Sequence, residues 1–240
     1  MEIFAHRGAS GDFPENTFAA FMEAARLPVF GVEFDVHMTA DGELVVIHDE
    51  LIDRTSDGTG YVKDMSLAEL KKHDFGNWFS PDFQGETIPT LADVLDVFDS
   101  THHKLNIEIK SDIFPYEGMV KKVLDVIESR QLESRVIISS FDHSAIQAVA
   151  KLNPRVETAA LFMEVLVNPL DYLRKIPADA LHLLFPAALR LSMAEVITSG
   201  MPVRTFTVND ETHAKTLKQA GVQAIFTDYP EKMNAFLHSI

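Results

Sequence analysis

Acidic side chains stand near the ends of two short apolar segments that are typical of β-strands. Glu33 and Asp35 lie near the end of residues 31–37, and Glu108 lies near the end of residues 105–110. A spacing of two on a strand places both side chains on one face. Three carboxylates in a half-buried site repel one another, and Mg²⁺ or Ca²⁺, which prefer oxygen ligands, would relieve that repulsion. The spacing therefore predicts one divalent-cation site made by Glu33, Asp35 and Glu108.

Two histidines and two basic side chains accompany these carboxylates. His6 and Arg7 end the first apolar segment, and His48 ends a short hairpin strand. Lys110 shares a strand face with Glu108. The carboxylates, a dication, Arg7 and Lys110 together leave one net positive charge, which suits the single negative charge of a phosphodiester. Arginine can donate two hydrogen bonds to two oxygens of one phosphoryl group. Imidazoles titrate near pH ~6.5 when unperturbed, so two histidines on either side of a phosphate can act as general base and general acid. The set predicts metal-assisted cleavage of a phosphate ester.

Short apolar segments alternate with longer amphipathic ones along the chain, which predicts eight strands that are each followed by a helix. The predicted strands are residues 2–6, 31–37, 105–110, 136–141, 156–162, 180–184, 203–208 and 223–227. The predicted helices are residues 15–26, 91–99, 117–130, 143–152, 168–175, 191–199, 210–220 and 230–239. Eight such units in ~250 residues fit a closed (β/α)8 TIM barrel, whose active site lies at the carboxyl ends of the strands. An open doubly wound sheet is the alternative, and the count of eight favours closure.

One stretch interrupts this alternation. Residues 43–48 form a second strand directly after residues 31–37, and Asp41-Gly42 between them is a strong hairpin signal. Residues 49–90 contain no clean strand–helix unit. Because some ~40 residues hardly support a core of their own, we interpret them as an inserted subdomain on the carboxyl-terminal face of a single domain that spans residues 1–240.

Composition excludes several classes of protein. The chain has 240 residues and a net charge of −15, from 21 Lys plus Arg against 36 Asp plus Glu. Such a surface repels phosphate, so no nucleic-acid partner is expected. Without cysteine there is no disulfide or thiol nucleophile. The first residues lack a basic and apolar leader, and no apolar stretch is long enough for a membrane anchor. These features predict a cytoplasmic protein, with a homo-oligomer left open.

An ordered series of motifs from His6 to Pro230 resembles that of the glycerophosphodiester phosphodiesterases. The motifs are His6-Arg7-Gly8, Pro14-Glu15-Asn16-Thr17, Glu33-Phe34-Asp35-Val36, Thr39-Ala40-Asp41-Gly42, His48-Asp49, Leu51, Arg54-Thr55, Gly58-Thr59-Gly60, Glu108-Ile109-Lys110, Thr207-Val208-Asn209 and Gly221-Val222 with Phe226-Thr227-Asp228-Tyr229-Pro230. The resemblance implies a (β/α)8 barrel with an insertion after the second strand. It also implies hydrolysis of glycerophosphodiesters, such as glycerophosphocholine or glycerophosphoethanolamine, to glycerol 3-phosphate and an alcohol.

The resemblance also implies roles for individual residues. The implied metal ligands, which would hold one Mg²⁺ or Ca²⁺, are Glu33, Asp35 and Glu108. His6 and His48 correspond to the acid–base pair, and Arg7 and Lys110 correspond to the phosphate contacts. Which histidine is the general acid stays open. The nucleophile that attacks phosphorus also stays open: it is either water or a glycerol hydroxyl, which would form a cyclic phosphate.

Two departures from the family bear on the substrate. Phe206 stands where the family often has Trp; it keeps an apolar wall for the substrate but loses the indole N–H donor. Residues 182–186 are unusually apolar for a barrel mouth. Lysophospholipids are therefore an alternative substrate class, and a non-catalytic phosphoester-binding barrel is an alternative function.

Three further polar residues have ordinary structural interpretations. Asn16 is typical of a helix cap or turn. Asp49 either orients a histidine or caps a turn. Asp228, just before Pro230, indicates the start of a helix.

Overall fold

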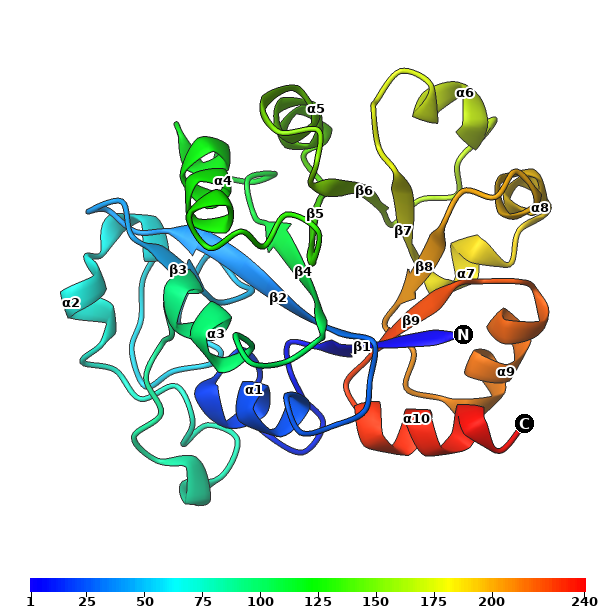
Figure 1. Ribbon diagram of the computed structural model, residues 1–240. Coiled ribbons are helices and arrows are strands. Elements are labelled where there is room, and N and C mark those ends of the chain that lie inside the picture. Colours follow the sequence, from blue (N-terminus) through cyan, green and yellow to red (C-terminus); the bar gives the residue numbers. More distant parts are fainter.

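Eight parallel strands close into a barrel, which confirms the predicted (β/α)8 fold and excludes the open sheet. The computed structural model describes residues 1–240, except for the side chains of residues 191 and 192. The barrel strands are β1 (Glu2–His6), β2 (Gly31–Met38), β4 (Lys104–Ile109), β5 (Val136–Ser140), β6 (Glu157–Phe162), β7 (Ala180–Leu184), β8 (Val203–Phe206) and β9 (Ala224–Thr227). Each pairs in parallel with its neighbours, and pairing of β1 with both β9 and β2 closes the ring. Helices surround this ring in Figure 1.

The helices that follow the strands also match the prediction, with ends that differ by at most three residues. They are α1 (Phe18–Ala24), α3 (Leu91–Val97), α4 (Met119–Ser129), α5 (His143–Leu152), α6 (Pro169–Leu173), α8 (Leu191–Thr198), α9 (Glu211–Gln219) and α10 (Pro230–His238). The largest difference is at α1, which begins at Phe18 rather than at residue 15. Asn16 adopts a left-handed φ of 56°, and the Thr17 side chain accepts a hydrogen bond from the Ala20 amide as the N-cap. A short helix, α7 (Phe185–Ala188), was not predicted.

Strand register places the site residues side by side. Asp35 on β2 is the register partner of Glu108 on β4, and Glu33 is the partner of both His6 on β1 and Asn106 on β4. In a parallel sheet, partners on neighbouring strands point to the same face. The carboxyl ends of β1, β2 and β4 therefore direct their polar side chains into one end of the barrel.

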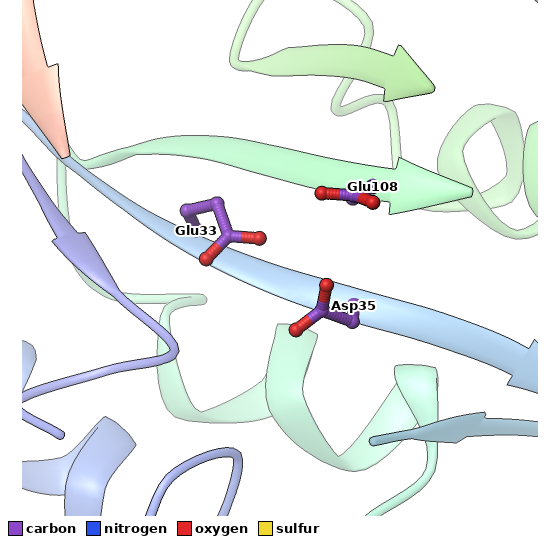
Figure 2. Close-up of side chains that lie close together, drawn as sticks. All are labelled: Glu33, Asp35 and Glu108. Carbon is purple, nitrogen blue, oxygen red and sulfur yellow. The ribbon is translucent and has the colours of Figure 1, made fainter. Parts of the chain in front are cut away.

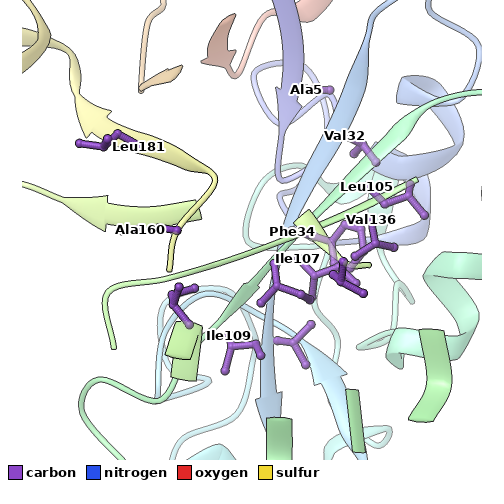
Figure 3. Close-up of a cluster of buried hydrophobic side chains, with 14 of the residues drawn as sticks. Ala5, Val32, Phe34, Leu105, Ile107, Ile109, Val136, Ala160 and Leu181 are labelled. Atoms are coloured by element: carbon purple, nitrogen blue, oxygen red, sulfur yellow. The ribbon is translucent and has the colours of Figure 1, made fainter. Parts of the chain in front are cut away.

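Most of the apolar core lies between the outer face of the strands and the helices (Figure 3). Phe34 and Ile107, on neighbouring strands, are fully buried there. Phe21 of α1 packs edge to face against Phe34 at 5.7 Å and against Phe98 at 6.3 Å. A separate layer fills the barrel interior, and its members are Phe4, Ile137, Ala159, Ala180, Ala224 and Phe226. Because alternate residues of β2 enter the core and the site, core packing fixes the positions of Glu33 and Asp35.

Truncation of one core aromatic provides a test of this packing. Phe21→Ala should lower the free energy of unfolding by about 3–5 kcal/mol, because it removes a ring that contacts two others and leaves a cavity. Met22→Ala is the matched control on the same helix, since Met22 is 48% exposed, and should change that free energy by less than about 0.5 kcal/mol. Urea titration measures both. Equal effects would contradict the proposed position of α1.

The hairpin predicted after β2 is present. β3 (Leu44–Val46) pairs antiparallel with β2. The next residues contain η1 (Val62–Asp64), α2 (Leu67–Leu70) and η2 (Pro81–Phe83). A small apolar cluster joins this stretch to the hairpin, and its members are Val45, Ile47, Ile52, Val62, Leu70, Phe75 and Ile88. The hairpin thus supplies part of the packing on which residues 49–90 depend. In the described part of the chain, none of the helices is both long and apolar enough to cross a membrane.

Candidate active site

Three carboxylates meet at the carboxyl ends of β2 and β4. Glu33, Asp35 and Glu108 each place one oxygen within 4.8 Å of the others. Figure 2 shows Glu33 and Asp35 on one strand with Glu108 on the next. Glu33 and Asp35 are buried, and the Glu108 side chain is 12% exposed. The structure therefore brings together all three predicted ligands, and an all-carboxylate set of this kind suits a hard dication such as Mg²⁺ or Ca²⁺.

The electrostatics of this acidic triad are uneven. Burial raises the pKa of Glu33 well above its usual value, and the charges of Asp35 and Glu108 raise it further. Burial likewise raises the pKa of Glu108. Burial also opposes ionisation of Asp35, but the positive charges of His48 and Arg7 outweigh it and lower the pKa of Asp35. The cationic side chains thus neutralise the negative charge of the triad only in part. A bound dication would neutralise the rest.

Arg7, the residue after β1, contacts two carboxylates of the triad. Its backbone has a left-handed φ of 53°, which turns the chain sharply where the strand ends. The backbone N–H of Arg7 donates to Glu33 Oε2 at 3.0 Å, and Nε lies 3.5 Å from Asp35 Oδ2. Nη1 donates to Glu15 Oε1 at 2.8 Å. Burial opposes the charge of the guanidinium, but Asp35, Glu15 and Glu33 outweigh burial and raise the pKa of Arg7. Arg7 is therefore a fixed cation beside the triad.

Lys110 is the second cation. Its Nζ donates to Glu108 Oε1 at 3.0 Å and lies 3.4 Å from His48 Nε2. Burial opposes its charge, but Glu108 and Asp35 outweigh burial and raise the pKa of Lys110. An ammonium group thus lies between the triad and one histidine.

His6 is oriented by a residue from the far end of the chain. Its Nδ1 lies 2.7 Å from Asp228 Oδ1, and its Nε2 lies 3.9 Å from Glu33 Oε2. Asp228 is held in turn by Asn209 Nδ2 at 2.6 Å and by Ser10 Oγ at 3.1 Å. Because an ionised carboxylate only accepts, Nδ1 of His6 carries a proton, and Nε2 faces the triad.

His48 has a matching arrangement. Its Nδ1 lies 2.6 Å from Asp49 Oδ1, so Asp49 orients a histidine, one of the two roles left open by the sequence. Arg54 fixes Asp49 through Nε at 2.7 Å and also binds Glu15, which holds Arg7. This network connects Arg54 and Arg7 to the loop that carries His48.

A cavity of about 570 Å³ opens over these groups. Phe206 lines it, packed edge to face against Phe141 at 6.1 Å, so the predicted apolar wall is present. Ile113 and Met163 also line it and are 60% and 58% exposed. The lining of the cavity therefore includes both charged and apolar side chains.

Two residues are more closely tied to the site than the sequence indicated. Asp228 does stand before α10, yet its carboxylate binds His6. Asn16 precedes the cap of α1 and donates from Nδ2 to Asp35 Oδ2 at 2.9 Å. Both residues belong to the motif series. Their position inside these motifs was the signal in the sequence that could have assigned them to the site.

Comparisons with known proteins agree with this geometry. A profile of the Glycerophosphoryl diester phosphodiesterase family matches residues 6–232. A glycerophosphodiester phosphodiesterase of Bacillus altitudinis is 40% identical over 237 residues, which cover 96% of each chain. One from Caldanaerobacter subterraneus is 40% identical over 231 residues, covering 96% of this chain and 95% of the relative.

A solved structure gives the same result. The Oleispira antarctica phosphodiesterase in complex with the product sn-glycerol-3-phosphate superposes with a TM-score of 0.94 at 30% identity. The match covers 99% of this chain and 97% of that one. Sequence, fold and site thus agree that the chain belongs to the glycerophosphoryl diester phosphodiesterase family and is a glycerophosphodiester phosphodiesterase.

Proposed function

We propose that this enzyme hydrolyses small glycerophosphodiesters, such as glycerophosphocholine and glycerophosphoethanolamine, to glycerol 3-phosphate and an alcohol, in a reaction that requires a divalent cation. The observation that carries the proposal is the buried acidic triad with His6 and His48 beside it at one cavity. The product bound to the Oleispira antarctica relative supports the choice of glycerol 3-phosphate. The net charge of −15 supports a small-molecule ligand rather than a nucleic acid.

The proposed cation is one Mg²⁺ or Ca²⁺, held by Glu33, Asp35 and Glu108. When bound, such an ion polarises a phosphoryl oxygen and stabilises charge that develops in the transition state. The donor set fits it, because three carboxylate oxygens already converge and the surrounding residues neutralise them only in part.

Arg7 and Lys110 are the proposed phosphate contacts, since both are fixed cations that line the cavity. His6 and His48 are the proposed acid–base pair. In each ring Nδ1 is bonded to a carboxylate, which leaves Nε2 to exchange a proton with the substrate. One imidazole takes a proton from the nucleophile and the other returns a proton to the departing alkoxide.

The expected products of glycerophosphocholine with Mg²⁺ or Ca²⁺ are glycerol 3-phosphate and choline. Phosphorus NMR of the reaction mixture separates glycerol 3-phosphate from phosphocholine, the product of cleavage at the other ester bond. Hydrolysis in water enriched in ¹⁸O labels the new P–O bond. A resonance from cyclic glycerol phosphate would reveal attack by the glycerol hydroxyl. Release of phosphocholine, or no turnover of either head-group diester, would contradict the proposal.

Lysophospholipids are a second candidate substrate class. The exposed apolar side chains of Ile113 and Met163 at the cavity could contact an acyl chain. Detergent-dispersed lysophosphatidylcholine belongs in the same assay. Faster choline release from it than from glycerophosphocholine would favour this candidate, and slower release would favour the small diesters.

A further inference from the structure

A buried histidine faces the cavity without a part in the proposed chemistry. His182 on β7 is fully buried, lines the cavity and packs against the Phe226 ring at 4.9 Å. Two other buried polar side chains, Asn106 and Ser139, line the same cavity. We call the surface formed by Asn106, Ser139 and His182 the cavity floor. Asn106 is the register partner of Glu33 and Ser139 is the register partner of Glu108, so the floor adjoins the triad inside the barrel.

Arg204 determines how the His182 ring is protonated. Its Nη1 lies 3.2 Å from His182 Nε2. A guanidinium can only donate, so Nε2 must accept and the single ring proton resides on Nδ1. Arg204 is itself fixed, because Nη2 lies 2.5 Å from Glu157 Oε1 and the guanidinium is 5.9 Å from the Phe4 ring centre. Burial, with the charge of Arg204 beside it, keeps the pKa of His182 well below its usual value, so the ring stays neutral.

The proton on Nδ1 has no acceptor within the protein. Nδ1 of His182 is buried and makes no hydrogen bond, and neither does Oδ1 of Asn106, whose Nδ2 donates to Ser139 Oγ at 2.9 Å. Buried polar atoms without partners are uncommon in folded proteins, and they cluster where a ligand or water completes them. The cavity floor thus presents one donor and one acceptor, both rigidly held.

We propose that the cavity floor binds a free hydroxyl of the substrate's glycerol moiety, which accepts a hydrogen bond from His182 Nδ1–H and donates one to Asn106 Oδ1. The proposal rests on the proposed function and adds to it a residue that selects for glycerol. A hydroxyl is the group that both donates and accepts. A phosphate oxygen would be repelled by the Asn106 carbonyl, and an ammonium would be repelled by the His182 N–H. Phe226 and Phe206 nearby can contact the glycerol carbons.

The test compares glycerophosphocholine with two analogues, the phosphocholine monoesters of 1,2-propanediol and 1,3-propanediol, which each lack one glycerol hydroxyl. The wild-type enzyme should prefer glycerophosphocholine over at least one of them by about 10-fold to 100-fold in kcat/KM. His182→Leu should lose that preference. His182→Gln should keep most of it, since the Gln carbonyl can accept from Arg204 while its amide donates into the cavity.

Direct binding gives a readout that does not depend on turnover. Isothermal titration with glycerol 3-phosphate and with the monophosphates of 1,2-propanediol and 1,3-propanediol should show the same preference in the wild type and its loss in His182→Leu. Arg204→Met should weaken the preference partly, because the ring proton is then free to move to Nε2. This variant also keeps the proposal falsifiable if His182→Leu does not fold, as judged by circular dichroism.

His103→Leu is the matched control. His103 also has a buried Nδ1 without a partner, but it precedes β4 at the opposite end of the barrel and contacts the Leu27 carbonyl at 3.0 Å. It should keep both rate and preference. Retention of the wild-type preference by His182→Leu, or by Arg204→Met where the first variant does not fold, would overturn the proposal. A wild-type enzyme that hydrolyses no glycerophosphodiester would instead overturn the proposed function.

Discussion

Removal of divalent cations with EDTA should reduce glycerophosphocholine hydrolysis by about 10³-fold or more, and Mg²⁺ or Ca²⁺ should restore it. The reason lies in the convergence of Glu33, Asp35 and Glu108 within 4.8 Å, with two of the three carboxyl groups having raised pKa values. Initial rates measured before and after chelation, with each cation added back separately, give the result and rank the metals.

The predicted metal site can also be tested through thermal stability. Glu33→Gln removes one of three mutually repelling charges and keeps the shape of the side chain. The metal-free variant should therefore melt at or above the wild-type Tm. A cation at 100 times its Kd should stabilise the wild type by about 2.7 kcal/mol and so raise its Tm, while leaving the Tm of the variant nearly unchanged.

Exposed Asp99 offers the matched control, since Asp99→Asn removes an acidic surface charge between α3 and the amino end of β4, whereas the triad lies at the carboxyl ends of the strands. It should keep both the activity and the thermal shift. Full activity in EDTA, or an equal shift for Glu33→Gln and wild type, would rule out the metal site.

His6→Ala and His48→Ala should each lower kcat by about 10²- to 10⁴-fold, with a much smaller effect on KM. Each ring has its Nδ1 bonded to a carboxylate, and its Nε2 lies near a charged group of the site, Glu33 for His6 and Lys110 for His48. Asp228→Asn and Asp49→Asn should cost less, because they disturb orientation while leaving the imidazole present. Steady-state kinetics with excess metal separates these effects.

A change of leaving group assigns the two roles. A p-nitrophenyl diester of glycerol phosphate departs as a stable phenolate and needs little protonation. The variant that lacks the general acid should therefore recover much of its rate on this substrate, while the variant that lacks the general base should not. Exposed His238 on α10 provides the control, and His238→Ala should retain the wild-type rate on both substrates. If both histidine variants keep wild-type rates, the acid–base assignment is wrong.

The barrel was predictable because its signals are local and repeat along the chain. Alternating apolar segments predicted β1 to β9 to within a few residues, and the spacing of Glu33 and Asp35 placed both carboxylates on one face. Convergence with Glu108 followed from the rule that parallel strands end at one rim of the barrel. Fold class and acidic cluster therefore depended on periodicity that a single sequence records.

Contacts between distant residues were harder to predict. The Asp228 carboxylate reaches His6 across 222 positions, and a proline two residues later made a helix start the natural interpretation. Arg204 and His182 are separated by 22 residues and meet only because β7 and β8 are neighbours in register. No local pattern encodes such pairs, and the side-chain rotamers that complete them depend on packing from several strands.

The hydrogen bond between His6 and Asp228 joins the first strand to the turn after the last one. The carboxylate that orients His6 therefore comes from a residue that is synthesised after every strand of the barrel. Pairing of β9 with both β8 and β1 brings that residue to His6. With His6 in its proposed role, enzymatic rate reports on whether the two ends of the barrel sheet have joined.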